Sequence, residues 1–262
     1  MSTSIYIMCL FFIFSACKRS SFQNDLNADK LIRINSPAKL NISDLVYDID
    51  TIRLETNDES VMNNISNMHI MNNKFYILAN NHTVIKIFDY NGKYLSQINN
   101  HGNGPDEYIR ISSFKVDKLN NRIIIADSFS RRIFAYDQYG KQLQNIKLDF
   151  EPITILPYDD AFINIYSGPR GIYENADMEN RNIHFLDKKG KFISSAIEID
   201  TPNSINISSM FQTGITKNGE ILFQPVLSEV TYQIRNNYEV IPLYAFVNNS
   251  SYNLLTLSEK NK

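Results

Sequence analysis

The chain has 262 residues, of which 43% are hydrophobic and 12% aromatic, so it is long enough to form one large domain or two smaller ones. Its formal net charge is −2, and it contains no long basic or acidic run. This balance argues against a nucleic-acid partner, which normally requires a clustered basic face.

An apolar run opens the chain. The residues IYIMCLFFIFSAC, 5–17, are too few to span a bilayer and are typical of a signal-peptide core. The run ends in FSAC, which resembles a bacterial lipobox, where cleavage leaves a lipidated cysteine at the new N-terminus. We therefore predict a signal peptide over 1–17, lipidation of Cys17 and membrane attachment through the acyl chains alone. The alternative is a buried strand or helix with an incidental cysteine.

Residues 18–44 are polar, and we predict that they form a tether. They lack an acidic cluster directly after Cys17, which Bacteroidetes lipoproteins use as a surface-export signal. We therefore expect an outer-membrane lipoprotein on the periplasmic face, with the cell surface as the alternative. The other cysteine, Cys9, lies inside the signal, so a mature chain that starts at Cys17 would have no disulfide.

Two segments repeat with a period of 48 residues: KFYILANNHTVIKIFDYNGKYLSQI starts at Lys74, and RIIIADSFSRRIFAYDQYGKQLQNI starts at Arg122. A D-x-x-G motif recurs at 89–92, 137–140 and 187–190, and a degraded fourth copy begins at Glu220. Between two strands, this motif is typical of a hairpin in which Asp caps the turn and Gly takes a positive φ. We therefore predict structural roles for its three aspartates, Asp89, Asp137 and Asp187.

Asn-Asn pairs are scattered along the chain. Asn tolerates the left-handed backbone and caps its own turns, so these pairs predict many tight turns. An AT-rich genome that favours Asn codons is the alternative explanation. The pairs lie at 63–64, 72–73, 80–81, 99–100, 120–121, 236–237 and 248–249.

Each repeat consists of short β-branched and aromatic runs between turn residues, which indicates strands. Four strands per repeat at this period are typical of a β-propeller. We predict an all-β fold, a β-propeller of four-stranded antiparallel blades over 45–262, with four to five blades present. A lone strand at 47–56 is expected to supply the outer edge of the last blade. The blades are expected at about 64–98, 111–148, 154–199 and 209–246.

The segment GNGPDEYIRISSFKVDKLNNRIIIADSFSRRIFAYDQYGKQL, from Gly102, strongly resembles the six-bladed β-propeller lipoproteins of Bacteroidetes, relatives of NHL-repeat propellers. They show a G-x-G-P-x-E-Y loop that leads into a blade. The later segment EVTYQIRNNYEVIPLYAF, 229–246, resembles their fourth blade. The resemblance implies a six-bladed ring whose chain continues for about two more blades than are present here. A smaller ring is the alternative.

In a propeller, the crossing from one blade to the next lies on the same face as the hairpins between the second and third strands, here called the top face. Loops on a rigid scaffold are common binding sites. The top-face segments are 79–84, 101–108, 127–132, 166–182 and 224–230. The candidate binding residues on or directly beside them are His82, His101, Asp106, Glu107, Arg110, Arg131, Arg132, Arg170 and Tyr173.

The loop HGNGPDEY, 101–108, has two interpretations. In the structural one, Gly102 and Gly104 supply unusual φ angles, Pro105 stiffens the turn, Tyr108 packs between blades and Glu107 binds backbone amides. In the other, its polar side chains also contact a ligand. The insertion at 166–182 is long for a hairpin and rich in charge, so we expect it to be the better functional candidate.

Catalytic patterns are sparse. The histidines at 69, 82, 101 and 184 show no zinc-ligand spacing, and no G-x-S-x-G motif is present. We predict no cofactor, no metal and a non-catalytic propeller that binds a protein, peptide or glycan partner. One alternative is a cation-dependent hydrolase or lyase of the lactonase type, using Glu107 and Asp127, although Asp127 is expected to cap a turn. The other is a non-functional or partner-completed fragment.

Overall fold

The computed structural model describes residues 30–34, 41–44, 46–165, 176–179, 181–198, 212–216, 218–225 and 228–248. These residues form seventeen strands and four 3-10 helices of three residues each, so the fold is all-β, as predicted. Over these ranges, no helix has the length and apolar character needed to cross a bilayer.

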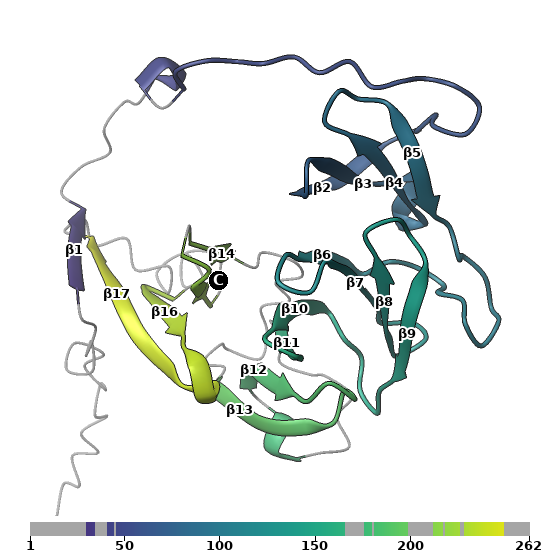
Figure 1. Ribbon diagram of the computed structural model, residues 1–262. Coiled ribbons are helices and arrows are strands. Elements are labelled where there is room, and N and C mark those ends of the chain that lie inside the picture. The colour runs from purple at the N-terminus through teal and green to yellow at the C-terminus, as the bar shows by residue number, and fades with distance from the viewer. Residues whose placement is uncertain are drawn as a thin grey trace, which may run out of the picture.

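Four sheets with antiparallel neighbours form the blades of a propeller (Figure 1). Each blade contains four consecutive antiparallel strands in chain order from its inner edge outward, which confirms the predicted fold. Blade 1 consists of β2 (Ile65–Met71), β3 (Lys74–Ala79), β4 (Val84–Asp89) and β5 (Tyr94–Ile98). Blade 2 consists of β6 (Ser113–Asp117), β7 (Arg122–Asp127), β8 (Arg132–Asp137) and β9 (Gln142–Lys147). Blade 3 consists of β10 (Thr154–Tyr158), β11 (Ala161–Ile165), β12 (Arg181–Leu186) and β13 (Phe192–Glu198). Blade 4 consists of β14 (Gln212–Ile215), β15 (Ile221–Gln224), β16 (Val230–Ile234) and β17 (Val240–Asn248).

The segment before blade 1 differs from the expectation. The strand predicted at 47–56 is not present: these residues belong to no strand and pair with no described strand. Instead, β1 (Lys30–Ile34), inside the segment expected to be a tether, pairs in parallel with β17 and adds a fifth strand to blade 4. The short 3-10 helix η1 (Ile42–Asp44) lies between β1 and this segment.

The D-x-x-G hairpins have the predicted geometry. The Asp89 carboxylate accepts hydrogen bonds from the backbone N–H groups of Asn91 (2.9 Å) and Lys93 (2.8 Å), and Gly92 has a φ of 83°. The carboxylates of Asp137 and Asp187 repeat this pattern in blades 2 and 3. The structural role of these aspartates is therefore confirmed. Left-handed asparagines also occur at other turns: Asn72, Asn73, Asn80, Asn81, Asn121 and Asn237.

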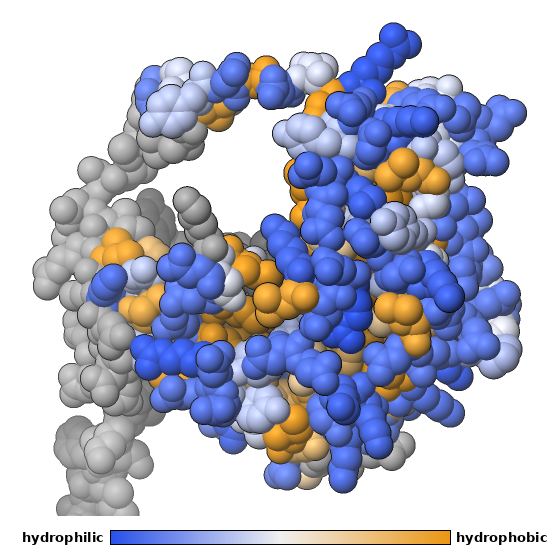
Figure 2. Space-filling view, in the orientation of Figure 1, coloured by the Kyte–Doolittle hydropathy of each residue, from blue (hydrophilic) through white to orange (hydrophobic). Residues whose placement is uncertain are grey.

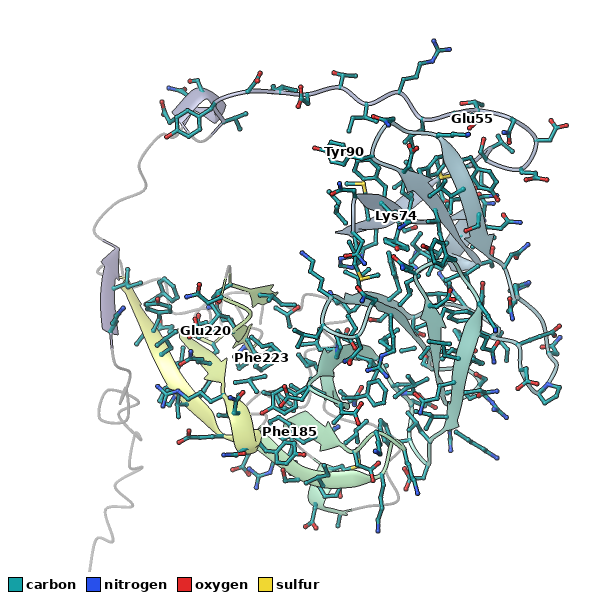
Figure 3. The ribbon with its side chains drawn as sticks, in the orientation of Figure 1. Glu55, Lys74, Tyr90, Phe185, Glu220 and Phe223 are labelled. Atoms are coloured by element: carbon teal, nitrogen blue, oxygen red, sulfur yellow. The ribbon has the colours of Figure 1, made fainter. Side chains whose placement is uncertain are left out.

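The core lies mainly between successive blades, where facing sheets bury apolar side chains against each other. One cluster joins blades 1 and 2, a second joins blades 2 and 3, and a third joins blades 3 and 4. In the third cluster, Phe185 of β12 and Phe223 of β15 are both buried between their sheets (Figure 3).

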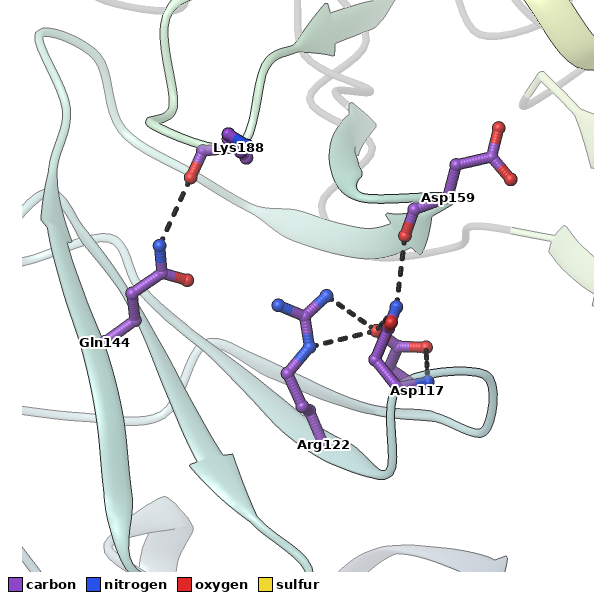
Figure 4. A network of polar contacts seen from close by, with 6 residues as sticks. Asp117, Arg122, Gln144, Asp159 and Lys188 are labelled. Carbon is purple, nitrogen blue, oxygen red and sulfur yellow. Dashed lines mark hydrogen bonds and ion pairs between the residues drawn. The ribbon is translucent and has the colours of Figure 1, made fainter.

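Polar contacts connect blades 2 and 3 at the face opposite the crossings (Figure 4). The buried Asp117 carboxylate accepts from the Arg122 guanidinium at 2.8 Å and from the Asn120 side-chain amide at 2.9 Å. The same Asn120 amide donates to the carbonyl of Asp159 in blade 3 at 3.3 Å. A hairpin of blade 2 is thus held against a hairpin of blade 3.

His184 of β12 is fully buried in blade 3, with Nε2 2.9 Å from the Met178 carbonyl oxygen and Nδ1 3.1 Å from the Asn164 side-chain amide. Burial lowers the pKa of His184 from 6.5 to about 4, although backbone hydrogen bonds favour the charged form. As the pH falls from 6.5 towards 4, the unfolded chain takes up a proton at this residue before the folded chain does. Above pH 6.5 the neutral His184 does not reduce the free energy of unfolding. Between pH 6.5 and pH 4, its resistance to protonation lowers that free energy by about 3 kcal/mol in total.

We expect the denaturant midpoint of the wild-type chain to fall more steeply between pH 6.5 and pH 4 than that of His184→Gln. Equilibrium urea unfolding at a series of pH values measures this difference. Equal pH slopes in the two proteins would contradict it.

Candidate functional site

The crossing from blade 1 to blade 2 folds back on itself on the top face. His101 and Tyr108 form an isolated bridge, the N–H of Gly102 donates to the Tyr108 carbonyl at 3.0 Å, and the N–H of Tyr108 donates to the Asn100 carbonyl at 2.9 Å. Inside this loop, the Glu107 carboxylate accepts from the N–H of Gly104 at 2.8 Å. The expected bond from Glu107 to a backbone amide is confirmed.

The glycines of this loop have a different role from the one predicted. Neither Gly102 nor Gly104 has a positive φ. A Cβ atom on Gly102 would lie 1.9 Å from Oε2 of Glu107, so the carboxylate occupies the space that a side chain would need. At position 102 the glycine leaves room for the Glu107 carboxylate rather than supplying an unusual backbone angle.

We expect Gly102→Ala to lower the free energy of unfolding by about 1 kcal/mol, because the added methyl group displaces Glu107 from the Gly104 amide. In a Glu107→Ala background the same substitution should cost much less, since nothing then occupies the space. A double-mutant cycle by urea unfolding measures the difference. The same penalty in both backgrounds would show that Glu107 is not the cause.

Tyr108 anchors the crossing between the two blades, as predicted. Its ring is fully buried in the blade 1–2 cluster and meets Phe134 edge-on, with ring centroids 6.1 Å apart. Its hydroxyl donates to the carbonyls of Thr83 (2.8 Å) and Ile98 (3.2 Å). Burial raises the pKa of Tyr108, so it stays a neutral donor at physiological pH.

Asp127 caps the β7–β8 hairpin, as predicted, and it also holds the crossing. Its fully buried carboxylate accepts from the N–H of Phe129 (3.0 Å), the hydroxyl of Ser130 (2.7 Å) and the N–H of Ile109 (2.7 Å). One carboxylate thus fixes two top-face segments that are far apart in the sequence.

Several predicted site residues make contacts within the protein. The His82 ring lies 3.2 Å from the Ile111 carbonyl through Nδ1, and its own carbonyl accepts from the N–H of Ile111 at 2.9 Å. The Asn145 side chain of β9 accepts from Arg132 at 2.7 Å and donates to Asp106 at 2.9 Å. Arg131 lies 3.9 Å from Glu151 in a partly exposed pair. His82, Arg132 and Asp106 thus connect the blade 1–2 crossing with its neighbouring blades, while Arg131 reaches the crossing from blade 2 to blade 3.

Two predicted residues, His101 and Arg110, are exposed, and no hydrogen bond or ion pair occupies their side chains within the described part of the chain. Two further exposed residues lie near them: Phe129, at 63% exposure, and Ile109. The Asp127 carboxylate accepts from the N–H of Ile109, which precedes Arg110, and from the N–H of Phe129, so these two backbone segments lie close together. We name this group the seam patch: His101, Ile109, Arg110 and Phe129.

Phe129 was missed from the sequence because the candidates on the top-face segments were chosen among polar side chains and tyrosine. Its position in a hairpin between two strands, where Asn81 stands in the preceding repeat, was the available signal.

Two candidates, Arg170 and Tyr173, lie outside the described residues, as does most of the insertion at 166–182. Within the described part of that insertion, the 3-10 helix η3 (Ala176–Met178) contacts β12 and β13. The roles predicted for Arg170 and Tyr173 therefore remain predictions.

Over the described ranges, no three His, Cys, Asp or Glu residues lie together in an arrangement that could hold a metal ion. Glu107 and Asp127, the carboxylates considered for a cation site, both accept hydrogen bonds from backbone amides. Two grooves, of about 380 and 340 Å³, lie along residues 53–65 and the β4–β5 turn, away from the predicted site residues.

A family model described as "Domain of unknown function (DUF4934)" matches residues 25–262. No curated protein matches the sequence. A solved structure from Bacteroides fragilis, assigned as an exported protein, is similar with a TM-score of 0.69 and 19% identity, covering 88% of this chain and 65% of its own. A DUF4221 family member from Bacteroides vulgatus has a TM-score of 0.51 and 13% identity, covering 74% of this chain and 61% of its own. At these identities the likeness is one of fold, and the chain spans less than two thirds of either protein.

Proposed function

We propose that this chain, which belongs to the family described as a domain of unknown function, DUF4934, is an exported, non-catalytic β-propeller that binds a partner through its top face. The partner is a protein, peptide or glycan, and the seam patch is the described part of the binding surface. Export is supported by the apolar run at 5–17 and by the fold shared with an exported Bacteroides protein.

One observation carries this proposal: the seam patch is exposed but rigidly supported. Arg110 and Phe129 emerge from backbone that a single buried carboxylate holds, while Tyr108 fixes the crossing below them. Arg and aromatic side chains are enriched in binding hot spots, and a fixed backbone leaves little loop ordering to oppose association. Other polar side chains of this face, Glu107, Asp127 and His82, contact backbone groups of the protein instead.

We further propose attachment through a lipidated Cys17 at the periplasmic face of the outer membrane, and a ring of the six-bladed, NHL-related type. The FSAC motif supports the first proposal. Two observations support the six-bladed ring. The chain forms four blades, and it spans less than two thirds of each of the two related structures.

We expect Arg110→Glu and Phe129→Ala to lower recovery of the partner at least about tenfold when the lipoprotein is isolated from envelope extract. Leu119→Ala is the matched control, since Leu119 is an exposed apolar residue of blade 2 in the hairpin on the opposite face. Quantitative mass spectrometry of the recovered proteins and glycans measures the change. Undiminished recovery with both seam-patch variants, or an equal loss with Leu119→Ala, would contradict the proposal.

A further inference from the structure

The D-x-x-G hairpins of blades 1, 2 and 3 are each followed by the same two kinds of residue, a lysine and, two positions later, a large aliphatic residue. The three copies read GKYL at 92–95, GKQL at 140–143 and GKFI at 190–193. The capping aspartate and the positive-φ glycine account for the turn itself. Neither of them requires a lysine or an aliphatic residue after the turn, so hairpin geometry does not explain these two positions.

The aliphatic residue of each copy lies in a β-bulge at the start of the outermost strand. In blade 1 the pairing shifts by one residue between Ile87 and Phe88, so Leu95 of β5 has no partner residue in β4. Leu143 of β9 and Ile193 of β13 are the extra residues at the same shift in blades 2 and 3. The three side chains are 42%, 53% and 40% exposed. Because their strands start from the D-x-x-G hairpins, they lie near the face opposite the crossings, here called the bottom face.

Two further exposed apolar side chains lie on bottom-face hairpins of blade 2. Leu119, at 82% exposure, is in the β6–β7 hairpin, and Tyr139, at 61%, is in the β8–β9 hairpin. The Asn72 side chain of blade 1 donates to Asn121 at 2.7 Å and to Gln138 at 3.3 Å, so it connects these two hairpins. We name the five exposed apolar residues the basal patch: Leu95, Leu119, Tyr139, Leu143 and Ile193.

Lysines lie on the same face as the basal patch. The Lys74 ammonium of blade 1 lies 5.1 Å from the centre of the Tyr139 ring. Four other lysines are exposed and, over the described ranges, have no hydrogen bond or ion pair at the ammonium group: Lys93, Lys118, Lys141 and Lys191. The bottom-face segments of blades 1 and 2 contain five bases and three acids, and they span 72–74, 89–93, 117–122 and 137–141.

The three acids of these segments are held within their own hairpins. The buried Asp117 carboxylate accepts from Arg122, and the carboxylates of Asp89 and Asp137 accept from backbone N–H groups of their turns. The exposed charges on this part of the surface are therefore the lysines. In blade 3, the β10–β11 hairpin adds two acids at 159–160, so the positive charge is greatest on blades 1 and 2.

This mixture of lysine, tyrosine and aliphatic side chains suits the headgroup region of an anionic bilayer. Tyrosine is enriched at that depth, aliphatic side chains enter the acyl boundary, and lysine stems lie along apolar surface while the ammonium groups bind anionic headgroups. The core of a stable protein interface is instead continuous, apolar and depleted in lysine. Over the blades in Figure 2, single hydrophobic residues are spaced among hydrophilic ones.

We propose that the basal patch rests on the surface of an anionic lipid bilayer, with blades 1 and 2 at the centre of the contact. The bottom face then lies against the membrane, and the top face, with the seam patch, points away from it. This contact goes beyond the proposed partner binding. It does not require acylation of Cys17, which would add to the membrane affinity.

The test uses the full protein isolated from its own envelope and mixed with vesicles whose headgroups carry nitroxide quenchers. A fluorescent residue replaces Leu119 in one sample and Phe129, on the top face, in the matched control. The vesicles contain phosphatidylcholine with or without phosphatidylglycerol. With phosphatidylglycerol, we expect quenching at position 119 to exceed quenching at position 129 at least about threefold, and we expect this excess to fall without it.

Charge reversal tests the lysines. Lys141→Glu, at the bottom end of β9, should lower the quenching at position 119 about threefold or more. Lys147→Glu is the matched control, because Lys147 is an exposed lysine at the other end of the same strand. It should leave the quenching unchanged.

Equal quenching at positions 119 and 129, or none at position 119, would overturn the proposal. So would quenching that does not depend on phosphatidylglycerol, or an equal loss with Lys147→Glu. Recovery of the partner by Arg110→Glu is measured separately in envelope extract. Failure of the basal patch is therefore distinguishable from failure of the seam patch.

Discussion

Tyr108→Ala is expected to lower the free energy of unfolding by about 4 kcal/mol, the typical cost of truncating a fully buried aromatic side chain. The ring fills the boundary between blades 1 and 2 beside Ile98 and Phe134, and truncation leaves a cavity there. Truncation also removes the hydroxyl, which contacts the carbonyls of Thr83 and Ile98. Urea unfolding followed by circular dichroism measures the loss.

Two further variants separate packing from hydrogen bonding at this position. Tyr108→Phe retains the ring and removes only the hydroxyl, so we expect a loss of about 1–2 kcal/mol. Tyr47→Ala is the matched control, because Tyr47 is fully exposed and its removal should change stability by less than about 0.5 kcal/mol. A loss at Tyr108→Ala as small as that at Tyr47→Ala would refute the role of Tyr108 as the anchor of the crossing.

Asp127→Ala is expected to destabilise the protein by about 3 kcal/mol, because it removes the acceptor for three donors in a buried site. The carboxylate accepts from the N–H groups of both Ile109 and Phe129, so both segments should loosen together. Hydrogen exchange should therefore become faster at these two amides, while the Asn91 amide, capped by Asp89 in blade 1, stays unchanged.

The conservative variant tests the same point without emptying the site. Asp127→Asn retains one acceptor oxygen and should cost less than Asp127→Ala, while it still weakens one of the two segments. Because both segments carry the seam patch, we expect both variants to reduce partner recovery as well. Full recovery from a chain whose Ile109 and Phe129 amides exchange rapidly would show that rigid support is not needed for binding.

The geometry of the D-x-x-G hairpins was predictable because it depends on residues within the same turn. Asp89 binds the amides of Asn91 and Lys93, and Gly92 takes its positive φ within the same turn. The period of 48 residues then extends the argument from one hairpin to a propeller, since residues at equal repeat positions have equal surroundings. The anchoring role of Tyr108 followed from the same period.

The candidate site was less predictable, because exposure depends on neighbours from distant segments. Arg132 and Asp106 were both expected to face a ligand, yet each contacts Asn145, a residue of the outer strand that sequence reasoning did not connect with them. Phe129 was not among the predicted site residues, yet it is 63% exposed on a hairpin that Asp127 ties to the crossing.

The sequence by itself determined the all-β class, the four-stranded repeat and the capped turns, because these depend on strand patterning and on contacts within a few residues. Only the tertiary structure decided which side chains are exposed and which backbone segments are paired. It showed that Gly102 is a glycine because the Glu107 carboxylate occupies its side-chain space. It also showed that residues 46–50, which have the pattern of a strand, remain unpaired. A strand needs an adjacent sheet edge as well as a pattern, and only the spatial arrangement of the blades determines whether that edge is present.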